Sequence, residues 1–237
     1  MATMSKWPKS FPPLTAEQVV ISDDFMKYWH EVLPKKFGMI DKFNHGVVVE
    51  DAGEFTRTLE IGAGLGEHLD YEKLTPAQER EYVANDIRAD MLAQLRERYP
   101  NVRTVLGDCQ KGFDFPDGHF DRVLAIHVLE HLPNLPLAVR ELHRVVDKKK
   151  GFLQVVIPCE GSLAYTLARR ISAQRIFEKR YKQPYRWFIE REHVNVPTEI
   201  LGELREKFDI KSTRRWPFPI PLEMVNLVIA LRCVPKQ

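Results

Sequence analysis

Cysteine is scarce in this sequence, with three residues in 237: Cys109, Cys159 and Cys233. An odd number of widely separated cysteines fits neither a disulfide framework nor a cluster of metal-binding thiolates. We therefore expect a protein of the reducing cytoplasm, and we expect no metal.

Long apolar runs are also lacking. No stretch reaches the roughly 20 consecutive apolar residues that a membrane-spanning helix needs. The first 14 residues, MATMSKWPKSFPPL, contain no apolar segment of the kind found in secretory signal peptides. These two absences predict a soluble, unsecreted protein without a transmembrane segment.

The chain has little excess charge of either sign. It contains 35 Lys and Arg residues against 33 Asp and Glu residues, a formal net charge of +2. Domains that bind nucleic acid in general usually carry a strongly basic surface, so nucleic acid is not an expected partner. The apolar content of 44% and the charged content of 29% are ordinary for a globular protein.

Strand-like and helix-like segments alternate from Arg57 onwards. The apolar strand-like runs cover residues 57–61, 82–86, 102–107, 120–127, 152–157, 209–214 and 225–232, and stripes with helical spacing lie between most of them. This alternation predicts an α/β fold with a doubly wound, mostly parallel seven-stranded sheet and helices on both faces. The short connection WPFPIPLE joins the last two strands. Because a parallel crossover needs about a dozen residues or more, the last strand should be antiparallel.

The segment before the sheet reads differently. Residues 1–20 hold several prolines among polar residues and are expected to form a flexible lead-in. A helix is predicted at about 22–33, with Ser22 as its N-cap and Pro34 as its end. Residues 21–237 then form a single domain.

The strongest local signal is the segment TLEIGAGLGEHL, residues 58–69. A strand ends at Ile61 and is followed by Gly62, Gly64 and Gly66, which allow backbone conformations closed to other residues and a close approach to a ligand. A helix beginning just after the loop would direct free N–H groups at an anion. A tight packing turn is the alternative. The third glycine comes too early for the dinucleotide fingerprint G-x-G-x-x-G, and an acid stands two residues before the first.

This pattern, [DE]-x-G-x-G-x-G, resembles motif I of class I methyltransferases that depend on S-adenosylmethionine (SAM). The resemblance covers residues 55–160 by motif and the rest of the chain by topology alone. It implies SAM as the cofactor. It also implies that the loop holds the methionine end of SAM through Glu60, Gly62, Ala63, Gly64 and Gly66.

Further strand ends complete the expected cofactor site. Asp86 ends the YVAND strand, where an acid can accept hydrogen bonds from two ribose hydroxyls. Its alternative role, as N-cap of the next helix, is compatible with the first. In the family that the sequence resembles, the residue at Asp108 takes the adenine amino group and the next one, Cys109, lies along the ring; a simple turn aspartate is the alternative. The remaining cofactor candidates are Ile87, Ile126 and His127.

His131 is the candidate catalytic residue. It follows the strand that, by the resemblance, faces the methyl group, and a histidine titrates near neutral pH. In the phosphobase methyltransferases a histidine at this place in the motif helps to deprotonate the substrate. The alternative is a histidine that packs the pocket wall.

Residues 160–196 are interpreted as a substrate-recognition insertion. The segment holds eight Lys and Arg residues against four acids, with aromatic residues interleaved. Arginine suits phosphate or carboxylate groups, and aromatic faces suit sugar rings. An amphipathic helical cap with a solvated basic face is the alternative.

Together these features predict a SAM-dependent methyltransferase acting on an oxygen or nitrogen of a small, anionic or sugar-containing metabolite. The alternatives are a non-catalytic SAM-binding accessory or sensor protein and, less favoured, an NAD-dependent oxidoreductase. No tyrosine is followed four residues later by lysine, so the usual short-chain dehydrogenase pair is missing. A homodimer is compatible with the sequence, which does not identify the acceptor.

Overall fold

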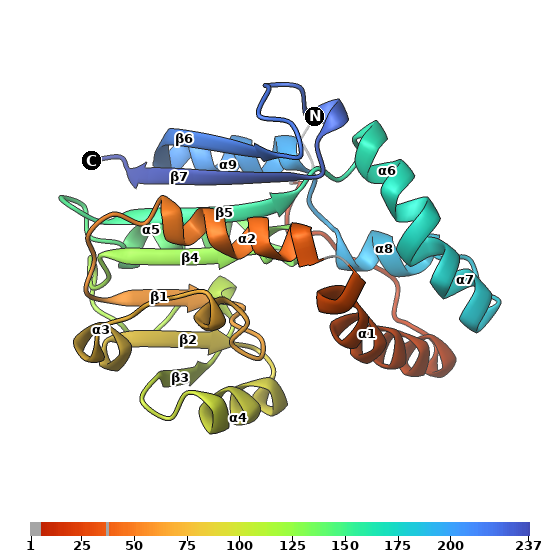
Figure 1. The fold of residues 1–237 in the computed structure, drawn as a ribbon, viewed down its shortest axis with the longest axis horizontal. Coiled ribbons are helices and arrows are strands. Elements are labelled where there is room, and N and C mark those ends of the chain that lie inside the picture. Colours follow the sequence, from red (N-terminus) through yellow and green to blue (C-terminus); the bar gives the residue numbers. More distant parts are fainter. Residues whose placement is uncertain (1–5, 37) are drawn as a thin grey trace, which may run out of the picture.

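The computed structural model describes residues 6–36 and 38–237, without the side chains of residues 29–36. A seven-stranded sheet runs through the molecule in the order β3-β2-β1-β4-β5-β7-β6 (Figure 1). Its strands are β1 (Thr58–Ile61), β2 (Tyr82–Asp86), β3 (Arg103–Leu106), β4 (Arg122–Ile126), β5 (Phe152–Pro158), β6 (Phe208–Trp216) and β7 (Val228–Pro235). The first five strands are parallel, and β7 runs antiparallel to both of its neighbours. The predicted α/β sheet with an antiparallel last strand is confirmed.

Helices cover both faces of this sheet, as predicted. The helices α5 (Leu135–Val145) and α9 (Pro197–Lys207) pack in one apolar layer, and α2 (Gly38–Glu50) and α4 (Ala89–Arg98) contribute to the other (Figure 1). Every residue of β1, β2, β4 and β5 is buried, because these interior strands are covered from both sides. The edge strand β6 is mostly exposed or partly exposed.

The N-terminal helix differs from the prediction. Helix α1 spans Ala16–Lys36, so it begins six residues before Ser22 and continues through Pro34. Thr15 starts it, because the Thr15 hydroxyl accepts a hydrogen bond from Gln18 N while the Gln18 side chain accepts one from Thr15 N. The predicted lead-in of residues 1–20 is therefore helical from Ala16, and residues 1–5 lie outside the described part.

Two more differences concern helices near the first strand. Helix α2 has no counterpart in the prediction; it carries two glycines, yet Val47 and Val48 pack it onto the sheet. The helix expected after the glycine loop is only a single 3-10 turn, η1 (His68–Asp70). After this turn the chain passes close to Arg122, which is fully buried on β4. There the Glu72 carboxylate lies 2.6 Å from the Arg122 guanidinium and 2.8 Å from His68 Nε2.

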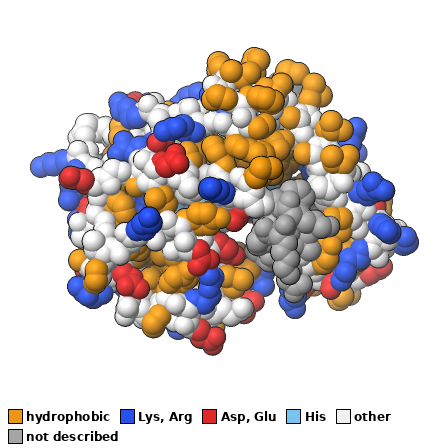
Figure 2. Space-filling view, viewed as in Figure 1, with side chains coloured by type: hydrophobic (Ala, Val, Ile, Leu, Met, Phe, Trp, Pro, Cys, Tyr) orange, Lys and Arg blue, Asp and Glu red, His pale blue; other side chains and the backbone are white. Residues whose placement is uncertain are grey.

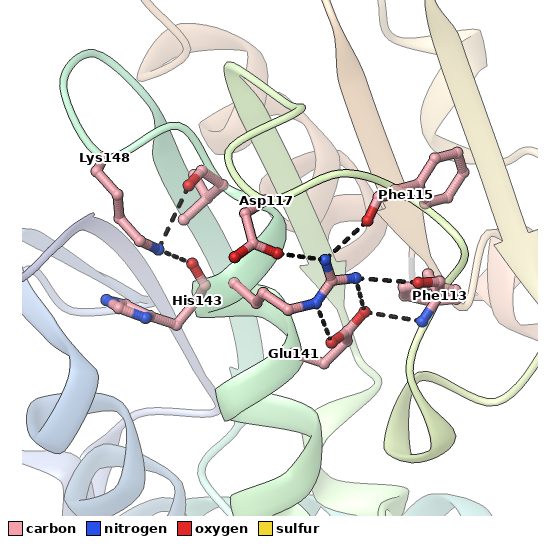
Figure 3. Close-up of polar contacts among 8 residues, drawn as sticks. Phe113, Phe115, Asp117, Glu141, His143 and Lys148 are labelled. Atoms are coloured by element: carbon pink, nitrogen blue, oxygen red, sulfur yellow. Dashed lines mark hydrogen bonds and ion pairs between the residues drawn. The ribbon is translucent and has the colours of Figure 1, made fainter.

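The connection between β3 and β4 is held to α5 by one arginine. The Arg144 guanidinium donates hydrogen bonds to the carbonyl oxygens of Phe113 and Phe115 and to the carboxylates of Asp117 and Glu141 (Figure 3). Glu141 in turn accepts from Phe113 N at 2.8 Å. This network fixes the loop that follows the Asp108 turn.

The segment between β5 and α9 forms a helical unit beside the sheet. It contains α6 (Leu163–Arg169), a π-helical turn η4 (Arg170–Gln174), α7 (Arg175–Tyr181) and α8 (Arg186–Glu192). Phe25 of α1 packs edge-to-face against Phe177 and Phe188 at ring-centroid distances of 5.1 Å. Helix α1 and the insertion therefore share a core separate from those of the sheet. None of the described helices has the length and apolar character that crossing a membrane requires.

Candidate active site

The predicted cofactor residues come together at one edge of the sheet. The strands β3, β2, β1 and β4 are parallel neighbours, so their carboxyl ends lie side by side. Hydrogen bonds join these ends: Ala63 N donates to Asn85 O at 2.9 Å, Gly64 N to the Asp86 carboxylate at 3.0 Å, and Gly107 N to Asp86 O at 3.1 Å.

The three loop glycines adopt conformations that other residues rarely take. Gly62, Gly64 and Gly66 have φ angles of 63°, 55° and 82°. A Cβ atom on Gly62 would lie 2.4 Å from a methyl group of Val128, and one on Gly66 would lie 3.0 Å from the Tyr99 ring. The loop therefore carries no side chain at these three positions, and it packs directly against the segment that follows β4.

Asp86 connects two parts of this edge. One carboxylate oxygen accepts from Gly64 N, and the other accepts from Arg88 N at 2.9 Å. Each oxygen can accept a second hydrogen bond. Arg88, and not Asp86, is the N-cap residue of α4, so Asp86 supports the start of that helix from two residues before the N-cap.

Glu60 lies deeper than the other loop residues. Its carboxyl group is buried and accepts a hydrogen bond of 2.7 Å from the Tyr82 hydroxyl on the neighbouring strand. Burial raises the pKa of Glu60 to about 8, although this hydrogen bond opposes the shift. Glu60 therefore joins β1 to β2 below the glycine loop.

The tips of β2 and β3 form an apolar edge beside Asp86. Ile87 is 72% exposed and Leu106, the register partner of Asp86, is 60% exposed. The Asp108 carboxylate accepts from Gln110 N at 2.9 Å and is only partly buried. Cys109 is buried, which raises the pKa of its thiol to about 12, so it contributes an uncharged surface.

The segment after β4 carries a strained histidine. Ile126 is buried and ends the strand, and His127 follows with a φ of +52°. His127 Nδ1 lies 3.1 Å from the Glu130 carboxylate, which is 1% exposed. Burial alone would raise the pKa of Glu130, but the hydrogen bond with His127 and the nearby His131 lower it below its ordinary value.

His131 lies in a crowded group of ionisable side chains. Its Nε2 is 3.9 Å from Glu130, its Nδ1 is 3.7 Å from Glu192, and its ring meets that of His193 edge-to-face at 5.2 Å. Removal from water lowers the pKa of His131 to about 4, and the Glu130 carboxylate offsets only part of this effect. His131 is therefore neutral near pH 7.

The sequence did not predict the other members of this group. His193 follows α8, and its Nδ1 lies 2.9 Å from the carboxylate of Glu160, which also pairs with Arg169. Burial would raise the pKa of Glu160, but His193 and Arg169 lower it. The one available signal was position: Glu160 comes two residues after β5 ends, at the same edge of the sheet as His131.

The aromatic residues of the insertion serve mostly in packing. Phe177, Tyr185 and Phe188 are buried around Phe25, so these three are core residues of the helical unit and not an open surface for a sugar ring. Tyr165, another aromatic residue of the insertion, lies near the cluster around His131, with its ring centroid 6.3 Å from that of His193.

An exposed apolar surface lies over α6 and the β6–β7 connection (Figure 2). On α6 and η4 it consists of Leu163, Leu167 and Ile171, which are 62–68% exposed. The connection adds the exposed side chains of Phe218, Ile220, Leu222 and Met224. The tip of this connection is thus exposed from Pro217 to Ile220.

Comparisons with known proteins agree with this architecture. Residues 59–154 match the model of a methyltransferase domain. The ubiquinone/menaquinone biosynthesis C-methyltransferase UbiE of Coxiella burnetii is 29% identical over 116 residues, which are 46% of this chain and 45% of that protein. The match thus spans less than half the length of this curated relative.

Solved structures share the fold over most of the chain. The PH0226 protein of Pyrococcus horikoshii has 18% identity and a TM-score of 0.61, covering 89% of this chain and 99% of that one. The 1,6-didemethyltoxoflavin-N1-methyltransferase of Burkholderia thailandensis, solved with S-adenosylhomocysteine (SAH), has 16% identity and a TM-score of 0.59, covering 96% and 94%. Residues 59–154 therefore contain a methyltransferase domain, and most of the chain has the fold of class I SAM-dependent methyltransferases, whose cofactor is SAM.

Proposed function

We propose that this protein transfers the methyl group of SAM to an oxygen or nitrogen of a small acceptor that is anionic or contains a sugar. One observation carries the proposal. Gly62 packs against Val128, and His131 with its neighbours Glu130, Glu192 and His193 lies in and around the turn that follows Val128. The glycine loop of residues 62–66 and the ionisable cluster around His131 are thus neighbours, which is the arrangement that a cofactor and an acceptor require.

The residues at the sheet edge fit SAM. The positive φ angles of Gly62, Gly64 and Gly66 give the loop a conformation that suits close approach of a ligand to its backbone, and Asp86 retains acceptor capacity for ribose hydroxyls. Ile87 offers an exposed apolar surface for adenine, with Asp108 beside it. When bound, SAM supplies an activated methyl group, and this chain's contribution is to align the acceptor and to favour loss of its proton.

His131 is proposed to act in proton removal as part of its group. The sequence suggested a lone base, but Glu130, Glu192 and His193 surround this imidazole. Three of the insertion's basic residues, Arg169, Arg180 and Arg186, are paired with carboxylates. The preference for an anionic acceptor therefore rests on the remaining basic residues of the insertion.

Binding and turnover test this function separately. SAH should raise the melting temperature of the purified protein by mass action on the native state, whereas NAD at the same concentration should not. A shift with NAD and none with SAH would overturn the assignment. A screen of small acceptors with methyl-labelled SAM then measures turnover. SAH binding without any labelled product across anionic and sugar-containing acceptors would favour the non-catalytic alternative.

Three remaining expectations belong to this proposal. We propose that the protein works in a reducing compartment, the cytoplasm, which its three free and buried cysteines support. A small molecule is the proposed partner, with no nucleic acid. If the protein forms a homodimer, the exposed apolar surface on α6 is the proposed contact, and light scattering of the purified chain measures that mass.

A further inference from the structure

Glu130, His131 and His193 bring three metal-binding groups to one place. One ligand atom from each lies within 4.8 Å of the other two. Glu130 and His131 belong to the 3-10 turn η3 (Leu129–His131), while His193 lies 62 residues further along the chain. Two imidazoles and one carboxylate are one of the ligand sets of catalytic zinc sites, which keep one coordination position open.

Each histidine has a carboxylate at its Nδ1 side. His193 Nδ1 lies 2.9 Å from Glu160, and His131 Nδ1 lies 3.7 Å from Glu192. The hydrogen bond between Glu160 and His193 Nδ1 fixes the tautomer of His193 and leaves its Nε2 lone pair for a metal ion, as in carboxylate–histidine–zinc arrangements. The Glu192 carboxylate is beyond hydrogen-bond distance of His131 and acts on it only through its charge. His131 Nε2 is the nitrogen that faces Glu130.

Glu130 provides an independent indication of a missing cation. Its side chain is 1% exposed, and among the residues that the structure describes its Oε2 atom has no hydrogen-bond partner. An unpartnered carboxylate oxygen in a buried position is costly unless a ligand satisfies it. Nearby, Glu160 pairs with the Arg169 guanidinium, whereas within residues 6–36 and 38–237 no ion pair joins Glu130 or Glu192 to a lysine or arginine. The carboxylates of this cluster therefore favour the binding of a cation.

We propose that Glu130, His131 and His193 bind one divalent transition-metal ion, zinc in the first instance, with a position left open for an oxygen of the methyl acceptor. Bonds of about 2.0–2.2 Å place two ligands of one ion roughly 3–4 Å apart, so the three groups need to close by up to roughly 1–2 Å. The mixed nitrogen and oxygen set suits zinc better than magnesium or calcium. The expectation of no metal was based on the cysteines alone. It did not include this cluster, because His193 is far from Glu130 and His131 in the sequence.

The site extends the proposed function, on which its catalytic role rests. A cation here would favour loss of a proton from an acceptor hydroxyl, so the proposal narrows the acceptor to one that offers oxygen. The proton then passes to water, an oxygen–methyl bond forms, and the sulfur–methyl bond of SAM breaks. The role of His131 becomes that of a ligand, and proton removal does not require a free imidazole.

Metal binding tests the site without any turnover. The full chain, freed of any affinity tag and treated with a chelator, is titrated with Zn²⁺ in competition with a chromophoric chelator. We expect one Zn²⁺ per chain. His131→Gln and His193→Gln should each weaken binding by about 100-fold or more, and Glu160→Gln by roughly 10–100-fold through loss of the support at Nδ1. His119→Gln, which removes a histidine outside the group, should change nothing.

A second readout keeps the test decisive if a variant folds poorly. Co²⁺ in the wild-type protein should give visible absorption bands typical of nitrogen and oxygen ligands, and Glu160→Gln retains all three ligands and should keep the bands. No stoichiometric Zn²⁺ binding, or binding that His193→Gln leaves unchanged, would overturn the site. The SAH affinity of each variant, measured on the same samples, should remain within about twofold of the wild-type value. If SAH fails to bind wild type, the proposed function is wrong, whereas the metal result stands by itself.

Discussion

Replacing Asp86 by alanine tests the cofactor edge most directly. The wild-type carboxylate, 7% exposed, accepts from Gly64 N and Arg88 N at 3.0 and 2.9 Å. Hydrogen bonds to a charged acceptor contribute roughly 1.5–3 kcal/mol each. Because water can enter the truncated site and solvate the freed N–H groups, we expect a net loss of about 3 kcal/mol. For a chain of this length that lowers the melting temperature by about 6–12 °C.

The same substitution should weaken SAH binding by tenfold or more, which corresponds to about 1.4 kcal/mol. Two effects add: the ribose loses its acceptor, and the glycine loop loses the contact that holds Gly64 in place. Calorimetry on folded Asp86→Ala protein measures the affinity, and thermal unfolding measures the stability. Asp90→Ala is the matched control, because Asp90 pairs with Arg88 at the exposed start of α4 and does not touch the loop. An unchanged SAH affinity in Asp86→Ala would refute the placement of the ribose, and an unchanged melting temperature would refute the estimate from the two hydrogen bonds.

Three further outcomes follow from the geometry. Gly64→Val should remove measurable SAH binding in calorimetry, because a branched side chain at a φ of +55° is strained by about 1–3 kcal/mol and its Cβ lies 2.9 Å from the Glu67 carboxylate; Gly202→Ala, in open space on α9, should bind normally, and normal affinity of Gly64→Val would contradict the loop assignment. Burial raises the pKa of Glu60 to about 8 from an ordinary 4.5, so the folded protein keeps a proton that the unfolded chain releases, and stability should fall as the pH rises from 4.5 toward 8. The melting temperature of the wild type should therefore drop between pH 6.5 and 8.5, and Glu60→Gln should flatten that slope; parallel slopes would argue against a protonated Glu60. Glu72→Gln should destabilise the fold by about 3–5 kcal/mol in chemical denaturation, since it leaves the buried Arg122 without its counter-charge, and a loss below 1 kcal/mol would mean that Arg122 is compensated elsewhere.

The arrangement of the proposed cofactor edge was predictable because its determinants are local. The glycine spacing and the acid at the end of β2 lie within short segments, and the alternation of strands with helices places all of these segments at one edge. Sequence could not predict the 3-10 turn after the loop. That turn depends on Arg122, a charge buried more than 50 residues later, which draws His68 and Glu72 toward it.

The sequence by itself determined the sheet, its antiparallel last strand and the motif that identifies the cofactor, because hydrophobic periodicity and turn chemistry act over a few residues. Tertiary structure alone decided which side chains meet around His131. His193 and Glu160 join His131 only because the chain after β5 folds through four helical segments and returns to the sheet edge. It also decided that the insertion's aromatic residues are core, since helix α1, from the other end of the chain, covers them. Such contacts depend on packing between distant segments, which no local pattern encodes.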